Sequence, residues 1–198
     1  APWDFVQVQL NYLDKNFQGG TEAAKYAASK GMGVIVMEPL RGGHLVNVPE
    51  KVEAAFKAAN PDKPMAEGAF DYCWNIPEVS MVLSGMTNTD IIDENIRYVE
   101  RFPEGGLSQD DAKVYEEVEK IFASYDTIPC TGCNYCAVCP EGITIPYNFQ
   151  TYNQYKLSGN RQRAEWEYGT SVILNGATAD ACTACGKCTE RCPQKINV

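Results

Sequence analysis

Residues 1 to 126 alternate between short apolar runs and longer amphipathic segments. The run DFVQVQL (4–10) alternates apolar and polar positions as a strand does. GVIVM (33–37) is continuously apolar, as in a strand buried on both faces, and VSMVLSG (79–85) predicts a third apolar strand. Apolar residues recur at helical spacing over 21–31, 50–59, 65–75, 87–102 and 108–126. Strands and helices that alternate in this way predict an α/β fold with a parallel sheet.

Several of these helices begin or end at residues that favour helix termini. Thr21 is the expected N-cap of the first helix, and Gly31 lies just past its end. Asn88 and Ser108 are the expected N-caps of the last two helices. The sequence therefore predicts the boundaries of these helices as well as their existence.

The pattern changes after residue 126. The stretch IPYNFQTYNQYKLSGNRQRAEWEYGTSVIL (145–174) predicts two helices, broken at Ser158-Gly159-Asn160. We therefore expect two domains, one of residues 1–126 and one of residues 127–198.

Composition and charge exclude several classes of protein. The 198 residues are 44% hydrophobic and 22% charged, which is typical of a globular protein. The net charge of -9 is concentrated in residues 1–126 and argues against nucleic acid or anionic lipid as the main partner. No apolar run approaches the roughly 18 residues of a membrane span, so we expect no membrane partner.

Eight of the nine cysteines lie in two short runs, CTGCNYCAVCP (130–140) and CTACGKCTERCP (182–193). Thiols three residues apart are poor disulfide partners, but they converge well around a metal. Zinc ribbons use two separate C-x2-C pairs, whereas C-x2-C-x2-C-x3-C-P is the bacterial ferredoxin pattern for a [4Fe-4S] cluster. The second run fits this pattern throughout, and the first departs from it only in its last spacing. The predicted ligands of two [4Fe-4S] clusters are Cys130, Cys133, Cys136, Cys139, Cys182, Cys185, Cys188 and Cys192.

The spacing also bears on which thiols share a cluster. In two-cluster ferredoxins the fourth cysteine of each run binds the other cube. The crossed pairing gives one cube Cys130, Cys133, Cys136 and Cys192. It gives the other cube Cys182, Cys185, Cys188 and Cys139. A pairing local to each run remains open, because Cys139 follows after two residues rather than three.

The stretch between the runs is too long for a simple ferredoxin hairpin, and its helical pattern predicts a helical dicluster module. We expect its Tyr and Trp side chains to pack around the clusters and to exclude water. Outside the runs, Cys73 stands beside Tyr72 and Trp74 in a helical segment and is expected to be a buried structural thiol. His44 is expected to be a surface loop residue.

The stretches WDFVQVQLNYLD, AAKYAASKGMGVIVMEPLRGGHL and VSMVLSGMTNTDIIDENI resemble strands six, seven and eight of the aldo/keto reductase barrel, with their following loops. The MEPLRGG and SGMTNTDIIDENI loops, together with the cysteine runs, resemble the aldo/keto reductases that carry a C-terminal iron-sulfur domain. The resemblance implies the last three βα units of a TIM-type (β/α)8 barrel, followed by a mostly helical dicluster ferredoxin-like domain. Strands one to five would be absent from this chain.

This resemblance implies an oxidoreductase that reduces small carbonyl compounds with NADH or NADPH. The family's catalytic tyrosine, lysine, aspartate and histidine lie on loops after the earlier strands, so we expect this chain alone to lack the catalytic tetrad and to be inactive. The resemblance also implies part of a nicotinamide site. Its residues are Gln7 at the carboxamide, Met37 at the ring-stacking position, Glu38, Pro39 and Leu40 beside the pyrophosphate, and Glu94 and Asn95 near the adenine. Gly85 and Ile91 stand where the family carries the cations that bind the 2'-phosphate of NADP, which weakens the expectation of NADP preference.

Two other functions stay open at this point. The chain could be an electron-transfer protein, similar to a ferredoxin, whose barrel part is scaffold, or a structural domain stapled by zinc. The first two functions imply a redox partner such as a flavoprotein or a ferredoxin, and clusters that degrade in air imply a reducing cytoplasm. The open edges of a small sheet also predict pairing with another chain in an oligomer.

Overall fold

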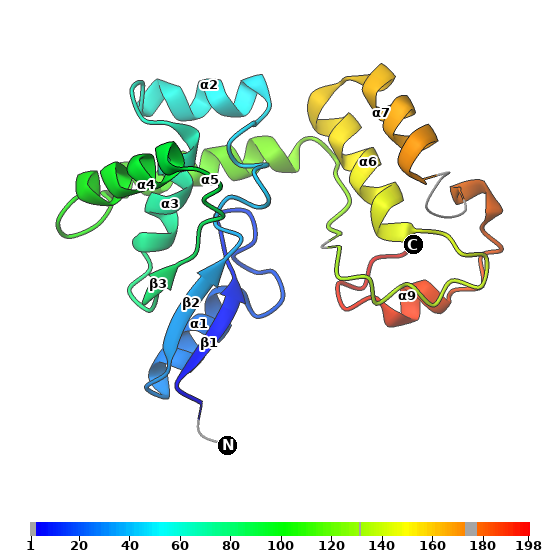
Figure 1. Ribbon diagram of the computed structural model, residues 1–198, viewed down its shortest axis with the longest axis horizontal. Coiled ribbons are helices and arrows are strands. Elements are labelled where there is room, and N and C mark those ends of the chain that lie inside the picture. Colours follow the sequence, from blue (N-terminus) through cyan, green and yellow to red (C-terminus); the bar gives the residue numbers. More distant parts are fainter. Residues whose placement is uncertain (1–2, 131, 173–177) are drawn as a thin grey trace. The chain divides into compact units, whose positions relative to one another are not determined.

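The computed structural model describes residues 3–130, 132–172 and 178–198. Contacts within the chain divide it into two units, Ala1–Phe122 and Ala123–Val198. The first unit contains strands and helices, and the second is mostly helical (Figure 1). The α/β class expected for the N-terminal part and the helical character expected for the C-terminal part are both confirmed.

The first unit is built on three strands, β1 (Phe5–Gln9), β2 (Gly33–Met37) and β3 (Met81–Val82). They form a parallel sheet in the order β1-β2-β3, as the sequence predicts. β3 is shorter than the predicted strand over 79–85. At its start the Ser80 hydroxyl, rather than a backbone carbonyl, accepts the N–H of Val34 at 3.1 Å. Just past its end, the N–H of Leu83 still donates to the Val36 carbonyl of β2 at 2.9 Å.

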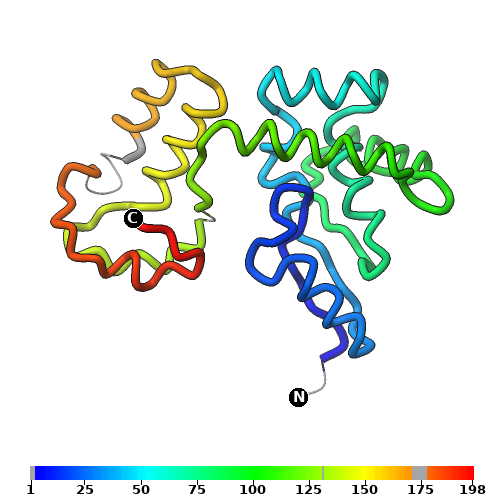
Figure 2. Tube along the Cα trace, turned by 180° about the vertical axis from the view of Figure 1, so that it is seen from behind, coloured from blue at the N-terminus to red at the C-terminus, as the bar shows by residue number. Residues whose placement is uncertain are grey.

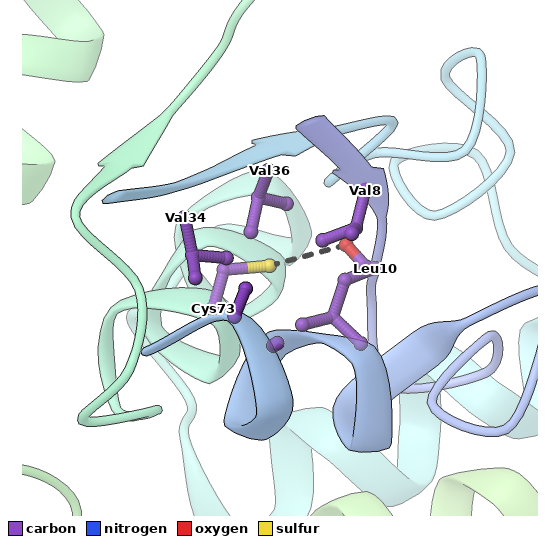
Figure 3. Close-up of a cluster of buried hydrophobic side chains, with 7 residues drawn as sticks. Val8, Leu10, Val34, Val36 and Cys73 are labelled. Atoms are coloured by element: carbon purple, nitrogen blue, oxygen red, sulfur yellow. Dashed lines mark hydrogen bonds between the residues drawn. The ribbon is translucent and has the colours of Figure 1, made fainter. Parts of the chain in front are cut away.

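One face of the sheet carries the core of this unit. Val8, Leu10, Val34 and Val36 occupy alternate positions on β1, β2 and the segment after β1, and pack with helices α1 (Gly20–Ser29) and α3 (Met65–Trp74) (Figure 3). Cys73 of α3 is fully buried among them, and its Sγ lies 3.5 Å from the Leu10 carbonyl oxygen. Burial raises the pKa of the Cys73 thiol to about 12. The expectation of a buried structural thiol is therefore confirmed.

The opposite face of the sheet is open. Phe5 is 57% exposed, Met81 is 55% exposed and Leu83 is 39% exposed. Gln7, Ile35 and Met81 are register neighbours on this face. The prediction that the second strand is buried on both faces is wrong for this structure, because no described element of the first unit covers this side.

The remaining helices of the first unit are α2 (Glu50–Ala59), α4 (Thr89–Arg101) and α5 (Gln109–Ala123). Two of the three expected N-caps are confirmed. The Asn88 side chain accepts the N–H of Ile91 at 3.0 Å, and the Ser108 hydroxyl accepts the N–H of Asp111 at 3.1 Å.

Thr21 is not an N-cap, because α1 begins one residue earlier, with Gly19 as its cap. Both the Thr21 N–H and its hydroxyl donate to the carbonyl of Lys15, at 2.9 and 3.1 Å. The Thr21 side chain therefore binds the preceding loop, whereas the prediction assigned it to the first turn of the helix.

The second unit contains α6 (Ile145–Ser158) and α7 (Arg161–Glu167), followed by a π-helical turn (Tyr168–Val172), a short 3-10 helix (Ala179–Ala181) and α9 (Lys187–Arg191). The break between α6 and α7 falls where the sequence predicts it. Gly159 has a left-handed backbone (φ 67°), and the Asn160 side chain caps α7 by accepting the N–H of Arg163 at 3.0 Å. Among the described residues, no helix is both long and apolar enough to cross a membrane.

Candidate metal centre

The two cysteine runs have the same backbone design. In each run a left-handed residue stands just before the second cysteine, Gly132 (φ 68°) in the first and Ala184 (φ 54°) in the second. Another stands just after that cysteine, Asn134 (φ 64°) and Gly186 (φ 76°). Left-handed residues turn the chain sharply, so each run is wound into a tight loop. The sequence repeat is thus also a structural repeat.

Hydrogen bonds hold the first loop to α6. The side chain of Asn153 accepts the N–H of Ile128 and donates to its carbonyl, both at 2.7 Å. The N–H of Cys130 in turn donates to the Ile128 carbonyl at 2.7 Å. Because Asn153 satisfies both backbone groups of one residue, it fixes the point at which the chain enters the first cysteine loop. Sequence reasoning missed this residue, which no motif marks.

The second loop is closed by short helices on both sides. The N–H of Cys182 donates to the carbonyl of Ala179 at 3.1 Å, at the end of the 3-10 helix. Cys188 lies on α9, and Cys192 follows directly after it as its C-cap. The Thr189 hydroxyl of α9 accepts the N–H of Val198 at 3.1 Å, which holds the end of the chain against this helix.

The two loops meet in space. The segment from residue 132 onward and the C-terminal segment run side by side in the second unit (Figures 1 and 2). Between them is an open cavity. Its cysteines are Cys130, Cys133, Cys136 and Cys192. The cavity thus gathers the four thiols of one expected cube, three from the first run and one from the second.

Apolar side chains form much of the remaining wall of this cavity. Ile145, Pro146 and Phe149 come from the first turns of α6, and Ile196 and Val198 come from the end of the chain. The expectation that Tyr and Trp side chains surround the clusters fails for this cavity, since none lines it. Four of those aromatic residues are exposed instead, Tyr147 by 44%, Tyr152 by 39%, Tyr155 by 39% and Trp166 by 67%.

Two contacts link the second cysteine loop to the first run and the segment after it. The Thr183 hydroxyl donates to the Glu141 carboxylate at 3.4 Å, which links the second loop to the segment just after Cys139. Burial raises the pKa of the Cys136 thiol above its ordinary value, and a backbone hydrogen bond lowers it in part. The neighbouring thiols of Cys130, Cys133 and Cys188 raise this pKa further. Cys136 therefore has neighbours from both runs.

The donor set suits a sulfur-bridged iron cluster. Thiolates are the ligands of such clusters, and the cavity presents four of them within a largely apolar wall. Cys133, Cys182 and Cys185 are exposed, and the other five clustered cysteines are partly buried. In the described part of the chain, no three His, Cys, Asp or Glu side chains are grouped closely enough to hold a single metal ion.

The residues expected at a nicotinamide lie around the carboxyl ends of the strands. Gln7 Nε2 donates to Met37 Sδ at 3.2 Å on the open face of the sheet. Glu38 is exposed and left-handed (φ 59°), and the next residue, Pro39, is buried. Asn95 on α4 donates to the Ser84 hydroxyl at 3.0 Å. The structure therefore brings Gln7 and Met37 together.

The rest of that set is more dispersed. Leu40 is half-buried in the turn after β2, and Glu94 is exposed on α4. His44 is exposed in the loop after β2, as expected. Whether these positions contact a cofactor remains a prediction.

A buried polar hub beside this turn was missed at the sequence level. Asp14 is 3% exposed, and its Oδ2 accepts from Gln9 at 3.0 Å and from Asn11 at 2.9 Å, with Arg41 Nε at 3.3 Å. Asn11 also donates to the Glu38 carbonyl at 3.0 Å. The hub ties the loop after β1 to the turn after β2. The Asn-x-x-Asp spacing directly after a strand is a turn signal that could have revealed it.

Residues 129–196 match the family model described as a 4Fe-4S dicluster domain. This segment includes all eight clustered cysteines, so the match supports iron-sulfur clusters as what they bind. Comparison with curated proteins gave no match.

Three solved structures similar to this chain are aldo-keto reductases. One is the apo form of an aldo-keto reductase from Bacillus halodurans, with 21% identity and a TM-score of 0.48, covering 60% of this chain and 44% of that one. Its holo form has 22% identity and a TM-score of 0.45, covering 57% of this chain and 41% of that one. The third is a thermostable aldo-keto reductase in complex with the inhibitor epalrestat. It has 20% identity and a TM-score of 0.42, covering 57% of this chain and 38% of that one. The chain thus spans less than half the length of these structures.

Proposed function

We propose that this chain is the C-terminal part of an iron-sulfur aldo/keto reductase, and that its eight clustered cysteines hold two [4Fe-4S] clusters. The observation that carries the proposal is the cavity lined by Cys130, Cys133, Cys136 and Cys192, inside the segment that matches the dicluster family. A bound cluster of this kind supplies one-electron transfer. The surrounding apolar side chains would limit the access of water to the cluster.

The same proposal interprets the first unit as the last three βα units of a barrel. Its sheet is parallel, and parallel sheets occur almost only where both faces are covered. Here one face exposes Phe5, Met81 and Leu83. Further strands and helices of a longer protein, or a second chain in an oligomer, would cover this face and pair with the edges of the sheet.

We also propose that Gln7 and Met37 contribute to a nicotinamide site. In barrels and open parallel sheets, ligands bind at the carboxyl ends of the strands. Gln7 is exposed, and among the described residues its side-chain amide donates only to the thioether sulfur of Met37, a weak acceptor. A cofactor carboxamide would be a stronger partner for this amide. The substrate would be a small carbonyl compound, reduced by the whole protein.

A measurement of cofactor binding tests this part of the proposal. Gln7→Leu in the full-length protein should weaken NADH binding about tenfold, the loss expected when a hydrogen bond of roughly 1.4 kcal/mol is removed. Gln162→Leu, a change of an exposed glutamine on α7, is the matched control and should leave binding unchanged. Equal affinity of Gln7→Leu and the parent protein would contradict a role for this amide.

The redox partners follow from the chemistry of the two cofactors. Nicotinamide transfers two electrons together as a hydride, and the clusters transfer one at a time, so a flavin normally stands between them. We propose a flavoprotein or a soluble ferredoxin as partner, and a reducing cytoplasm as location.

The test of the cluster proposal is the iron and acid-labile sulfide content of the anaerobically purified protein. Two [4Fe-4S] clusters predict about eight irons and eight sulfides per chain. Stoichiometric zinc with no labile sulfide would overturn the proposal. Cys73→Ala is the matched control, because it removes a thiol from the core of the first unit and should leave the iron content unchanged.

Pairs of substitutions show which cysteines share a cube. Under the crossed pairing, Cys130→Ala with Cys192→Ala damages one cube, and one intact [4Fe-4S] cluster remains. Under the same pairing, Cys182→Ala with Cys192→Ala damages both cubes. The number of reduced [4Fe-4S] spins per chain, measured by electron paramagnetic resonance, should be one for the first pair and zero for the second. The reverse result would establish a pairing local to each run.

A further inference from the structure

The cationic side chains of the second unit fall into two groups. The three Lys and Arg side chains of α6 and α7 are each paired with an acid. The pairs are Lys156 with Asp126 at 3.4 Å, Arg161 with Glu165 at 2.8 Å and Arg163 with Glu167 at 2.8 Å. The remaining three cations of this unit all lie at the second cysteine run or just after it. The two groups therefore differ in whether their charge is neutralised locally.

The second group consists of Lys187, Arg191 and Lys195, and all three are exposed. Lys187 and Arg191 are four residues apart on α9, so they share a face of this helix. Lys195 follows in a turn, where its N–H donates to the Cys192 carbonyl at 3.0 Å. Within the described part of the chain, the side chains of these three residues form no ion pair and no hydrogen bond. Their charges are therefore directed to solvent and not to the fold.

The sign of this local charge is opposite to that of the whole protein. The chain has a net charge of -9, whereas residues 181–198 contain these three cations and a single acid, Glu190. A patch of one sign on a protein surface attracts partners of the opposite sign and speeds their encounter by about 10–1,000-fold. The end of the chain therefore suits an acidic partner.

The patch also borders the part of the cluster centre that is nearest to solvent. Cys182 and Cys185 are exposed, and they serve the same cube under both the crossed and the local pairing. Gly186 follows Cys185 directly and is the N-cap of α9, the helix that carries Lys187. Figure 1 shows α9 at the lower edge of the second unit. Electrons pass only between centres that approach closely, so a partner held by these cations would stand beside the exposed thiols.

We infer that Lys187, Arg191 and Lys195 form a docking surface for a small acidic carrier of single electrons, which exchanges electrons with the cluster held by Cys182 and Cys185. The inference rests on the proposed function. Electron-transfer encounters have small interfaces, so a few charges are enough to direct them. With the flavodoxin hydroquinone anion as carrier, the flavin gives up one electron and becomes the neutral semiquinone. The oxidised cluster gains that electron, and no proton is transferred.

The experiment measures this transfer by stopped flow, with the anaerobically purified full chain and a flavodoxin of strongly negative net charge. The rate is read from the semiquinone absorbance. The variant Lys187→Gln with Arg191→Gln and Lys195→Gln removes the patch. At about 0.01 M salt its second-order rate constant should be about tenfold lower than that of the parent, because the steering field is lost. At about 0.5 M salt the two should agree, because charges are then screened beyond roughly 4 Å.

The matched control removes the same number of charges from the other group, by Lys156→Gln with Arg161→Gln and Arg163→Gln. Its rate constant should stay within about twofold of the parent value at low salt, since those cations are already paired. An equal loss in the control would overturn the inference, because the effect would then follow the net charge alone. A loss of the same size at both salt concentrations would also overturn it, since the cations would then act on the cluster potential and not on docking.

Equal rate constants of parent and patch variant at low salt are a further refuting result. If the patch variant also lost a salt-sensitive self-association of the parent, the surface would belong to a second copy of this chain. Should the triple variant not assemble clusters, Lys187→Gln with Lys195→Gln takes its place. Failure of both variants to assemble contradicts the inference, because side chains needed only for docking are not needed for assembly.

Reduction by photoreduced deazaflavin, an uncharged reductant, separates this inference from the proposed function. Parent clusters that deazaflavin reduces and the flavodoxin does not would refute the docking surface alone. A parent protein without iron and sulfide would refute the proposed function itself.

Discussion

The ion pair between Lys63 and Asp71 offers a sharp test of the energetics of the first unit. Lys63 Nζ lies 2.6 Å from Asp71 Oδ2, and the Asp71 side chain is 2% exposed. The other carboxylate oxygen, Oδ1, is buried and has no hydrogen-bond partner among the described residues. Removal of the lysine charge by Lys63→Met would therefore leave a buried carboxylate without its cation.

Several charges act on this carboxyl group. Burial raises the pKa of Asp71, the hydrogen bond and the charge of Lys63 lower it, Asp111 raises it, and Arg101 lowers it, with a net increase. Glu67, on the same helix, also has a raised pKa, mainly because of burial. The charge of Arg101 lowers this pKa in part. A carboxyl with a raised folded pKa binds protons more tightly in the native state, so its contribution to stability is present at low pH and is lost as the pH rises through the folded pKa.

The magnitude has a physical upper limit. Without Lys63, the cheapest response is for Asp71 to fold in its protonated form. From an ordinary carboxyl pKa of about 3.9, this costs about 4 kcal/mol at pH 7 and about 1.5 kcal/mol at pH 5. Loss of one partner of a buried pair typically costs 3–5 kcal/mol. We therefore expect Lys63→Met to lower the free energy of unfolding by about 2–4 kcal/mol at pH 7, and by about 1 kcal/mol at pH 5.

The assay is urea unfolding at both pH values, followed by the fluorescence of Trp74. This ring stacks on Phe70 at a centroid distance of 5.5 Å, and Trp3→Phe with Trp166→Phe removes the other two tryptophan signals. Lys113→Met is the matched control, because its ion pair with Asp110 has the same 2.6 Å distance but is 71% and 89% exposed. It should change stability by less than about 0.5 kcal/mol. A loss in Lys63→Met that is the same at pH 5 and pH 7 would refute the reasoning.

Three further predictions concern the cysteines and their clusters. Ala184→Gly should raise the free energy of unfolding by about 0.5 kcal/mol, because a left-handed backbone (φ 54°) costs alanine about 1–2 kcal/mol and the greater unfolded-state freedom of glycine offsets part of that gain. Gly132→Ala (φ 68°) should lower the free energy of unfolding, and a change of the same sign for both variants in urea unfolding would contradict the account. Iodoacetamide at pH 8 should not modify Cys73 in the folded protein, because burial raises its pKa to about 12, and mass spectrometry of the native protein would reveal any modification. NADPH alone should not bleach the cluster absorbance of the full-length protein until a flavoprotein or reduced ferredoxin is added, and rapid stoichiometric bleaching would disprove the need for a flavin.

Local signals in the sequence determined the helices and their ends well. Asn88, Ser108 and Gly159 act through hydrogen bonds or backbone geometry that extend over only a few neighbouring residues, so their roles can be inferred without the fold. Thr21 shows the limit of this inference. Its polar groups bind Lys15 in the preceding loop, and that loop conformation depends on contacts that no local pattern contains.

The same holds for the cluster centre. The sequence by itself determined which eight thiols serve as candidate ligands, because their spacing and the prolines that follow carry the chemistry of the site. It left open whether the fourth cysteine of each run belongs to its own run or to the other. Only the tertiary structure placed Cys192 in a cavity with Cys130, Cys133 and Cys136, since this depends on how the end of the chain packs against the first loop.

Tertiary structure also decided the polar groups around these sites. The Asp14 hub and the attachment of the first loop by Asn153 both depend on which groups fall within hydrogen-bond reach after folding. The sequence gives the type of each side chain, but burial and the position of possible partners decide whether it caps a helix or anchors a loop. A hydrogen bond acts over about 3 Å, so its partners are known only when segments distant in the sequence have been brought together.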